Sequence, residues 1–225
     1  MKLILASQGF TTPDIAKAVE TLVNKPLKEI NISIINESYV GIPANEDKRW
    51  LINELSLIPK YIGGTIDFIN LRAYSIDEIR ERLSNTDLIY IVGGSLLVLP
   101  KILKETGFDL LLKKLIDTKV IMGTSAGAMV LGKQVESSEY WKECYEEDIN
   151  NIVDKQLEVV NFNIIPHYLR EDRKEYTYDF YNRFLSNNPF LIYAINDEQA
   201  VIYDNGNISF VGGSPVVFGK EKQKQ

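Results

Sequence analysis

The sequence predicts an α/β fold of three layers, in which helices cover both faces of a doubly wound, mostly parallel sheet and a β-hairpin lies near the C-terminus. Short β-branched runs alternate with longer segments of helical period, which is typical of βαβ units. Residues 88–92 are Leu-Ile-Tyr-Ile-Val, apolar at every position, as a central strand buried on both faces must be. Asn205-Gly206 lies between two apolar runs and is a strong hairpin signal.

The expected strands are short apolar or β-branched runs, and they lie at residues 2–6, 29–36, 65–71, 87–92, 119–122, 159–165, 191–195, 200–203 and 208–211. The first run turns polar at Ser7-Gln8-Gly9, so it is shorter than the roughly 7 to 15 apolar residues of a signal-peptide core. No stretch approaches the ~20 apolar residues that a membrane helix needs. We therefore expect a cytoplasmic protein with no membrane partner.

Capping signals mark the helices between these strands. Thr12-Pro13-Asp14 places a capping hydroxyl before a proline, and apolar residues follow at helical spacing to Val23. Ser75 with Glu78 forms a capping box that opens a helix ending near Leu83. Another amphipathic helix is expected at residues 110–116. A set of aromatic residues spaced by four is interpreted as the inner stripe of a helix: Tyr176, Phe180 and Phe184.

Composition limits the classes of function. The 225 residues, 45% hydrophobic and 25% charged, predict one domain over residues 1–225, with a polar and frayed tail at 220–225. The net charge of −6 leaves no basic surface for nucleic acid. One cysteine and one histidine cannot form a disulfide or a Cys/His zinc site, so we expect no metal and no cofactor.

The sharpest motif is Gly123-Thr124-Ser125-Ala126-Gly127, which matches G-x-S-x-G and lies between a predicted strand and a helix-compatible segment. This is the setting of a nucleophile elbow. The first amides of a helix lack partners, so the Ala126 amide could stabilise an oxyanion formed by attack of Ser125. The alternative interpretation is a tight turn in which Ser125 merely caps the helix.

A serine nucleophile needs a base, and His167 is the single histidine of the chain. It follows the strand predicted at 159–165, at the rim where open α/β sheets place their sites. Asp197, with Glu198 in reserve, follows the strand at 191–195 and could orient the imidazole. The order serine, base, acid differs from the serine, acid, base order of α/β-hydrolases, which disfavours that class.

A second oxyanion donor is expected in Val92-Gly93-Gly94-Ser95, where two glycines let the backbone approach a substrate closely. We assign this role to the amide of Gly94 or Ser95. A glycine turn needed only for chain reversal is the alternative. A phosphate loop is excluded, because no Gly-Lys-Ser/Thr follows.

Taken in order, these motifs resemble peptidase family S51, whose members include dipeptidase E, an aspartyl dipeptidase, and cyanophycinase. The matching stretches are Ile91-Val92-Gly93-Gly94, residues 103–109, residues 123–128, Ile165-Pro166-His167-Tyr168 and Ala194-Ile195-Asn196-Asp197. The resemblance runs from about Asp87 to Phe218. It implies the fold of class I glutamine amidotransferases, with Ser125 as nucleophile, His167 as base and Asp197 in the acid position.

The sequence departs from the family at two places. Asp197 stands where dipeptidase E and cyanophycinase have glutamate, and Gly93-Gly94-Ser95-Leu96-Leu97 replaces the usual Gly-Gly-Gly-Asn-Thr. The loss of that asparagine means that a strict preference for an N-terminal aspartyl residue is not implied. Arg170 and Arg173 are candidates to hold a substrate carboxylate, although arginines on a surface helix are more often solvated charges.

The expected function is hydrolysis of short, dipeptidase E-type peptides, including aspartyl dipeptides, through an acyl-enzyme on Ser125, with a small peptide as the partner. Two alternatives stay open, a glutaminase-like amidase and a catalytically silent module that binds a small ligand. The amidase chemistry on this fold resembles one with cysteine at the elbow, whereas Cys144 lies in a charged segment without that setting. Edge strands and the tyrosine-rich residues 176–181 would permit a homodimer.

Overall fold

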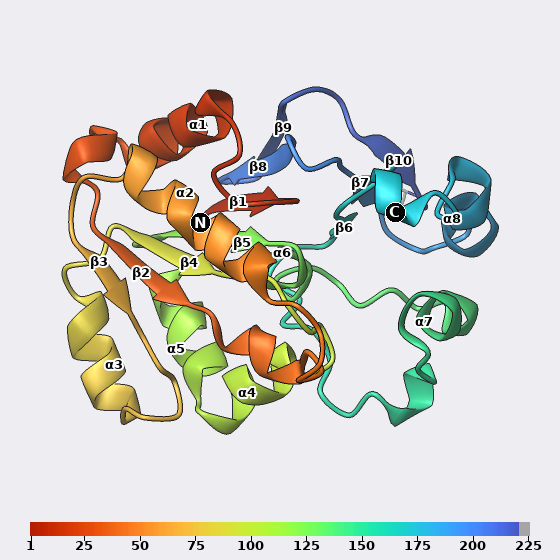
Figure 1. The fold of residues 1–225 in the computed structure, drawn as a ribbon, viewed down its shortest axis with the longest axis horizontal. Helices are drawn as coiled ribbons and strands as arrows, with labels where there is room; N and C mark the ends of the chain where they lie inside the picture. Colours follow the sequence, from red (N-terminus) through yellow and green to blue (C-terminus); the bar gives the residue numbers. More distant parts are fainter. Residues whose placement is uncertain (221–225) are drawn as a thin grey trace.

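The computed structural model describes residues 1–220, apart from the side chain of Arg173, and shows a seven-stranded sheet between two layers of helices (Figure 1). The first five strands in the sheet order are parallel, and the last two form an antiparallel hairpin that pairs with β1. The order is β3 (Ile66–Phe68), β2 (Ile32–Ile35), β4 (Leu88–Ile91), β5 (Val120–Thr124), β1 (Lys2–Ala6), β8 (Ala200–Asp204) and β9 (Asn207–Val211). This arrangement confirms the predicted fold class.

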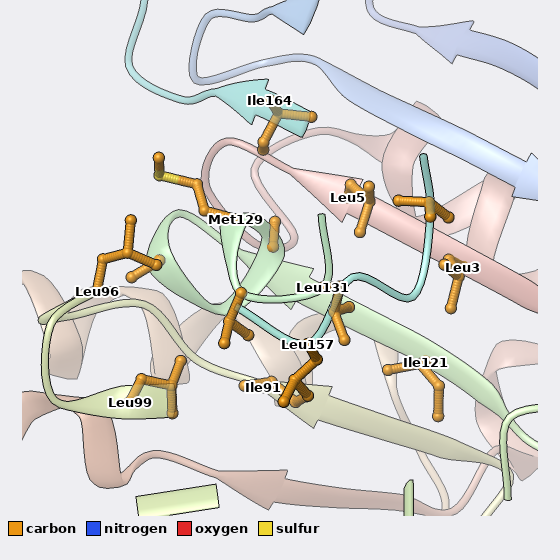
Figure 2. Packing of buried hydrophobic residues seen from close by; sticks show 14 of the residues in the cluster. Leu3, Leu5, Ile91, Leu96, Leu99, Ile121, Met129, Leu131, Leu157 and Ile164 are labelled. Atoms are coloured by element: carbon orange, nitrogen blue, oxygen red, sulfur yellow. The ribbon is translucent and has the colours of Figure 1, made fainter. Parts of the chain in front are cut away.

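Side chains alternate between the two faces of the sheet, as the period of a strand requires. Leu3 and Leu5 of β1 join one hydrophobic cluster, and Ile4 joins the other. The helices α1 (Pro13–Val23) and α2 (Arg49–Tyr61) cover the face of Ile4. The opposite face packs against α3 (Ile76–Leu83), α4 (Leu99–Glu105) and α5 (Phe108–Leu115), and Figure 2 shows part of this core.

A second, three-stranded sheet contains the strands that precede His167 and Asp197. Its order is β10 (Val216–Phe218), β7 (Ile192–Ala194) and β6 (Asn163–Ile165), with β6 and β7 parallel. The expected strand at 159–165 is therefore shorter and lies outside the main sheet. The amides of Leu157 and Val159 instead donate to the carbonyls of Val130 and Leu131, so this segment packs along the loop after the elbow.

The predicted starts of α1 and α3 are confirmed, whereas the helix expected at 110–116 is α5 and begins earlier, at Phe108. The Thr12 hydroxyl accepts a hydrogen bond from the amide of Ile15, and Ser75 and Glu78 form the reciprocal capping box. The strand expected at 29–36 is shortened, because Leu27–Glu29 forms the 3-10 turn η1 and β2 begins at Ile32.

Several helices were not predicted from the sequence. These are α2, α4 and α7 (Ser138–Tyr145), together with the 3-10 turns η2 (Glu37–Gly41), η3 (Ile149–Asn151) and η4 (Glu171–Arg173). The short α6 (Ala126–Met129), by contrast, is the helix expected directly behind the elbow. Helix α2 contains Pro59 and has no side-chain cap, so it lacks the usual signals.

The aromatic helix α8 (Tyr178–Leu185) is oriented differently from the prediction. Tyr181 and Leu185 are its buried residues, whereas Phe180 and Phe184 are half-buried beside them. The predicted stripe therefore flanks the inner face, and Tyr176 lies before the helix.

The expected frayed tail lies, from residue 221 onward, outside the described residues. Within residues 1–220, no helix combines the length and the apolar character that crossing a membrane requires.

Candidate active site

Ser125 lies on a sharp turn between β5, which ends at Thr124, and α6, which begins at Ala126. Its φ of 49° and ψ of −121° are unusual for a residue with a side chain and cost about 1–3 kcal/mol. The motif glycines allow this turn, because a Cβ added to Gly127 would lie 2.1 Å from the carbonyl oxygen of Ile91. The strand-turn-helix setting predicted for the motif is thus present.

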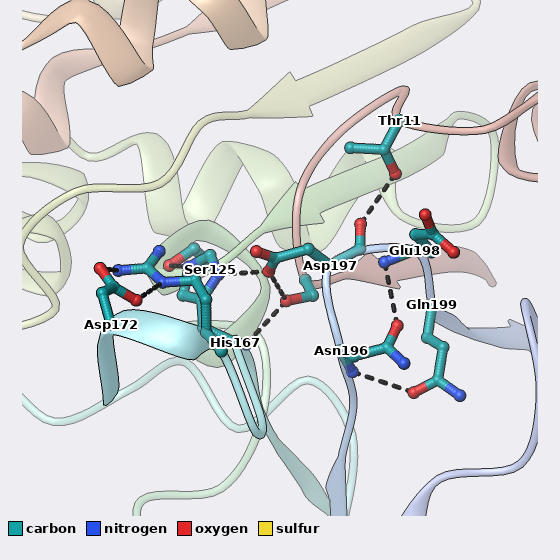
Figure 3. A network of polar contacts seen from close by, with 10 residues as sticks. Thr11, Ser125, His167, Asp172, Asn196, Asp197, Glu198 and Gln199 are labelled. Atoms are coloured by element: carbon teal, nitrogen blue, oxygen red, sulfur yellow. Dashed lines mark hydrogen bonds and ion pairs between the residues drawn. The ribbon is translucent and has the colours of Figure 1, made fainter. Parts of the chain in front are cut away.

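His167 lies two residues beyond β6 and faces the serine. Its Nε2 is 3.0 Å from the Oγ of Ser125, and its Nδ1 is 2.5 Å from the Oδ1 of Asp197 (Figure 3). If Nδ1 carries the proton, it donates to the carboxylate and leaves Nε2 as an acceptor for the serine hydroxyl. The structure therefore brings together the three residues that the sequence singled out.

Asp197 follows β7, whose carboxyl end lies beside that of its parallel neighbour β6. Burial by itself would raise the pKa of the Asp197 carboxyl, but hydrogen bonds from His167 and Ser7 and the charges of His167 and Arg170 hold that pKa below its ordinary value. Glu198, the reserve acid, is exposed, and its amide donates to the side chain of Asn196. Of the two acids, Asp197 is the one that contacts the imidazole.

Ser7 is a site residue that the sequence analysis did not select. Its side chain is fully buried, and its Oγ donates to the Oδ1 of Asp197 at 2.8 Å. The same Oγ accepts a hydrogen bond from the backbone amide of His167 at 2.7 Å, and the hydroxyl of Thr11 donates to the carbonyl of Asp197 at 2.8 Å. The sequence signal that could have identified Ser7 is its position directly after the first strand, at the carboxyl end of a parallel sheet.

The glycine loop after β4 lies against the nucleophile. A Cβ at Gly93 would lie 2.8 Å from the Cβ of Ser125, and Gly94 has a φ of +146°. The amide of Ser95 donates to the carbonyl of Ser38 in η2, which corrects the assignment of Ser95 as an oxyanion donor. Among the described residues, no acceptor bonds the amide of Gly94, so this amide is available instead.

A buried carboxyl, Glu54 of α2, lies beneath the site and was also missed. It is 4% exposed, and its Oε1 accepts hydrogen bonds from the hydroxyls of Tyr90 (2.7 Å) and Thr124 (2.6 Å). Burial raises the pKa of Glu54, and the bonds from Thr124 and Tyr90 and the nearby His167 only partly offset this effect. The Oγ1 of Thr124 also accepts from the amide of Gly93, so Glu54 supports the glycine loop as well as the elbow.

Two cavities open on either side of Ser125 and His167. The larger, of about 450 Å³, extends toward α7 and α8, and the smaller, of about 260 Å³, extends toward α2 and includes Glu54. Arg170 lines the smaller cavity, but its guanidinium bonds Asp172 at 2.6 and 2.9 Å. The other arginine suggested by the sequence, Arg173, has a side chain outside the described part of the chain.

Known proteins resemble this chain in sequence and in fold. The Listeria monocytogenes protein "Uncharacterized peptidase Lmo0363" is 27% identical over 62% of the chain and 67% of its own length. The Pasteurella multocida protein "Uncharacterized peptidase PM1590" is 25% identical over 77% of the chain and 84% of its own.

Solved structures show the same fold. The crystal structure of a "Putative Peptidase E Protein" from Listeria monocytogenes EGD-e superposes with a TM-score of 0.71 at 22% identity, covering 93% of this chain and 96% of that one. A peptidase from an acI-B1 Actinobacterium superposes with a TM-score of 0.65 at 17% identity, covering 97% and 93%. The sequence model of peptidase family S51 matches residues 17–211, which include the elbow, the histidine and the aspartate. The chain therefore belongs to peptidase family S51.

Proposed function

We propose that this serine-type peptidase cleaves the amide bonds of short peptides through an acyl-enzyme on Ser125. The observation that carries the proposal is the unbroken path from the Asp197 carboxylate through both ring nitrogens of His167 to the Ser125 hydroxyl, at 2.5 and 3.0 Å. These are the separations that proton transfer through an oriented imidazole needs.

In the acylation half-reaction, Nε2 of His167 accepts the proton of Ser125 while the serine oxygen attacks the carbonyl carbon of the scissile amide. The resulting oxyanion accepts hydrogen bonds from the amides of Gly94 and Ala126. The tetrahedral intermediate collapses when the imidazolium gives the same proton to the leaving amine. An ester on Ser125 and a free amine are formed.

In the deacylation half-reaction, His167 takes a proton from water, and the hydroxide attacks the ester carbonyl. The second tetrahedral intermediate expels the serine oxygen, which recovers its proton from the imidazolium. Asp197 stays ionised throughout and stabilises the charged ring. Its lowered pKa supports this role, because the carboxyl keeps its charge at mildly acidic pH.

Replacement of the nucleophile tests the mechanism. Ser125→Ala should reduce kcat for a short peptide by a factor on the order of a million, because the acyl-enzyme cannot form. Ser138→Ala serves as the control, since Ser138 is an exposed serine on α7. Near-normal peptide hydrolysis by purified Ser125→Ala protein, with the control equally active, would remove Ser125 from the mechanism.

A further inference from the structure

The larger cavity beside Ser125 has a mixed lining, in which apolar and aromatic side chains outnumber the polar ones. Leu96 and Leu97 of the glycine loop and Met129 of α6 line it together with the nucleophile. The far side is formed by the tyrosines of α7 and of the segment around α8, of which Tyr140, Tyr145 and Tyr176 line the cavity. Its volume of about 450 Å³ falls within the range of cavities that hold small organic ligands.

The walls of this cavity are held by contacts among themselves. The rings of Tyr140 and Tyr145 meet edge to face at 5.9 Å, and those of Tyr176 and Tyr181 stack at 6.0 Å. The hydroxyl of Tyr145 contacts the sulfur of Met129 at 3.6 Å. Tyr140 is 2% exposed, and its burial raises the pKa of its phenol well above the ordinary value. The aromatic wall of the cavity is therefore held in place by its own packing.

The charges around the nucleophile disfavour an acidic side chain. Among the side chains described, none that lines the larger cavity is a lysine or an arginine, whereas Glu46 lines both cavities. In the smaller cavity Glu54 adds a second carboxyl, and Arg170 is already bonded to Asp172. An aspartyl side chain in either cavity would lose its hydration without gaining a free cationic partner.

Leu96 is among the residues that line this cavity and is otherwise buried in the core, at 4% exposed. It occupies the position at which the family's usual motif has asparagine, so a hydrogen-bonding group is replaced by a branched apolar one. The change agrees with the rest of the lining, which offers contact area rather than charge. Burial of a Phe- or Leu-sized side chain here would be favoured by the hydrophobic effect.

We propose that the larger cavity binds a bulky apolar or aromatic side chain next to the scissile bond, so that the substrates are short peptides with such a residue and not aspartyl peptides. This inference rests on the proposed function. The gain from burying such a side chain, compared with alanine, corresponds to a preference on the order of 10- to 100-fold in kcat/KM.

The first test is a set of dipeptides in which Phe, Leu, Ala or Asp is placed at each position in turn, with Ala at the other position. The wild-type enzyme should prefer Phe or Leu over Asp at one of the two positions by at least about tenfold in kcat/KM. A preference for Asp, or a flat profile at both positions, would overturn the inference.

A charge introduced at the half-buried Leu97 should reverse the selectivity. Leu97→Arg places a cation in the cavity, so kcat/KM for the Asp dipeptide should rise relative to that for the Phe dipeptide by about tenfold or more. Leu97→Met is the matched control, because it keeps the apolar character and similar size. An unchanged Phe-to-Asp ratio in Leu97→Arg would contradict the assignment of the cavity.

A second pair of variants tests the aromatic wall. Tyr176→Ala should lower kcat/KM for the Phe dipeptide several-fold more than for the Ala dipeptide, because the larger side chain loses more contact area. Tyr178→Ala is the control, because Tyr178 is 50% exposed and does not line the cavity. Equal losses for both dipeptides in Tyr176→Ala would overturn the side-chain role of this wall.

Covalent labelling of Ser125 by a small fluorophosphonate distinguishes a failure of the proposed function from a failure of the cavity assignment. Labelling of Ser125 without any preference for apolar dipeptides would leave the proposed function standing and reject the cavity assignment. If Ser125 is not labelled and no dipeptide is cleaved, the proposed function itself fails.

Discussion

At the scale of single residues, Ser7 links His167 to Asp197 by hydrogen bonds but takes no part in the proposed chemical steps. Ser7 Oγ joins the backbone of His167 to the carboxylate of Asp197, which come from two different strands. A buried hydroxyl with a donor on one side and a charged acceptor on the other has one favourable orientation. In the proposed mechanism Ser7 is therefore expected to act as a positioning residue for His167 and Asp197.

Ser7→Ala should lower kcat by about 10- to 100-fold with little change in KM, because a hydrogen bond to a charged group is worth about 1.5–3 kcal/mol. The measurement is steady-state kinetics on a short peptide. Ser33→Ala is the matched control, since Ser33 is a buried serine of β2 that bonds Thr86 away from the site. Equal kcat losses in the two variants would show that Ser7 acts only through stability.

The three site residues were selected from the sequence by rarity, motif or position: His167 is the single histidine, Ser125 lies in the elbow motif, and Asp197 follows a predicted strand. The single histidine and a serine between glycines left few alternatives for base and nucleophile. Ser7 and Glu54 were not selected as site residues, because a serine after a strand and a glutamate in a helix occur at many positions without function. The sequence left the oxyanion donor open between Gly94 and Ser95, because it could not show that η2 would present the Ser38 carbonyl to the Ser95 amide.

At the scale of elements, helix α2 connects the outer layer to the elbow through Glu54. The carboxyl accepts from Tyr90 in β4 and from Thr124 in β5, so one helix residue joins two adjacent strands. Because the pKa of Glu54 is raised in the folded protein, its stabilising contribution is fully present below the unfolded pKa, near 4.3, and is lost as pH rises through the folded pKa.

Glu54→Gln should therefore raise the stability of the protein relative to wild type at pH 7, with the advantage disappearing as pH falls toward 4. The amide keeps an oxygen acceptor for Tyr90 and Thr124 without a buried charge. Urea unfolding at both pH values measures the difference. Glu46→Gln, at an exposed position, should show no such pH dependence, and an equal response of the two variants would contradict this account of Glu54.

The elements themselves were predictable where local signals are strong. The starts of α1 and α3 were predictable from their capping residues Thr12 and Ser75, and the hairpin of β8 and β9 from Asn205-Gly206. Each of these signals is local in the sequence. The division of the strands between two sheets was not predictable, because it depends on pairing between residues far apart in the chain. The strand expected at 159–165 was predicted too long for this reason, since its first half bonds the loop after α6 and only its end forms β6.

At the scale of the whole molecule, the candidate site forms where the two sheets meet. The main sheet contributes Ser125 from the end of β5 and Ser7 from the end of β1. The small sheet contributes His167 and Asp197 from the ends of β6 and β7, and lies beside α8 (Figure 1). The proposed mechanism thus requires that Ser125 and His167 stay in contact across the two sheets, and the hydrogen bonds of Ser7 join the same two sheets.

The central claim is that Ser125 is a nucleophile activated by His167, and covalent labelling tests it most directly. Wild-type protein treated with a small fluorophosphonate should gain one phosphonyl group, located on Ser125 by peptide mass spectrometry. Labelling should be absent in Ser125→Ala and slowed by orders of magnitude in His167→Ala, because the hydroxyl then lacks its base. A folded wild-type protein that gains no adduct at Ser125, or that reacts equally fast without His167, would contradict the account.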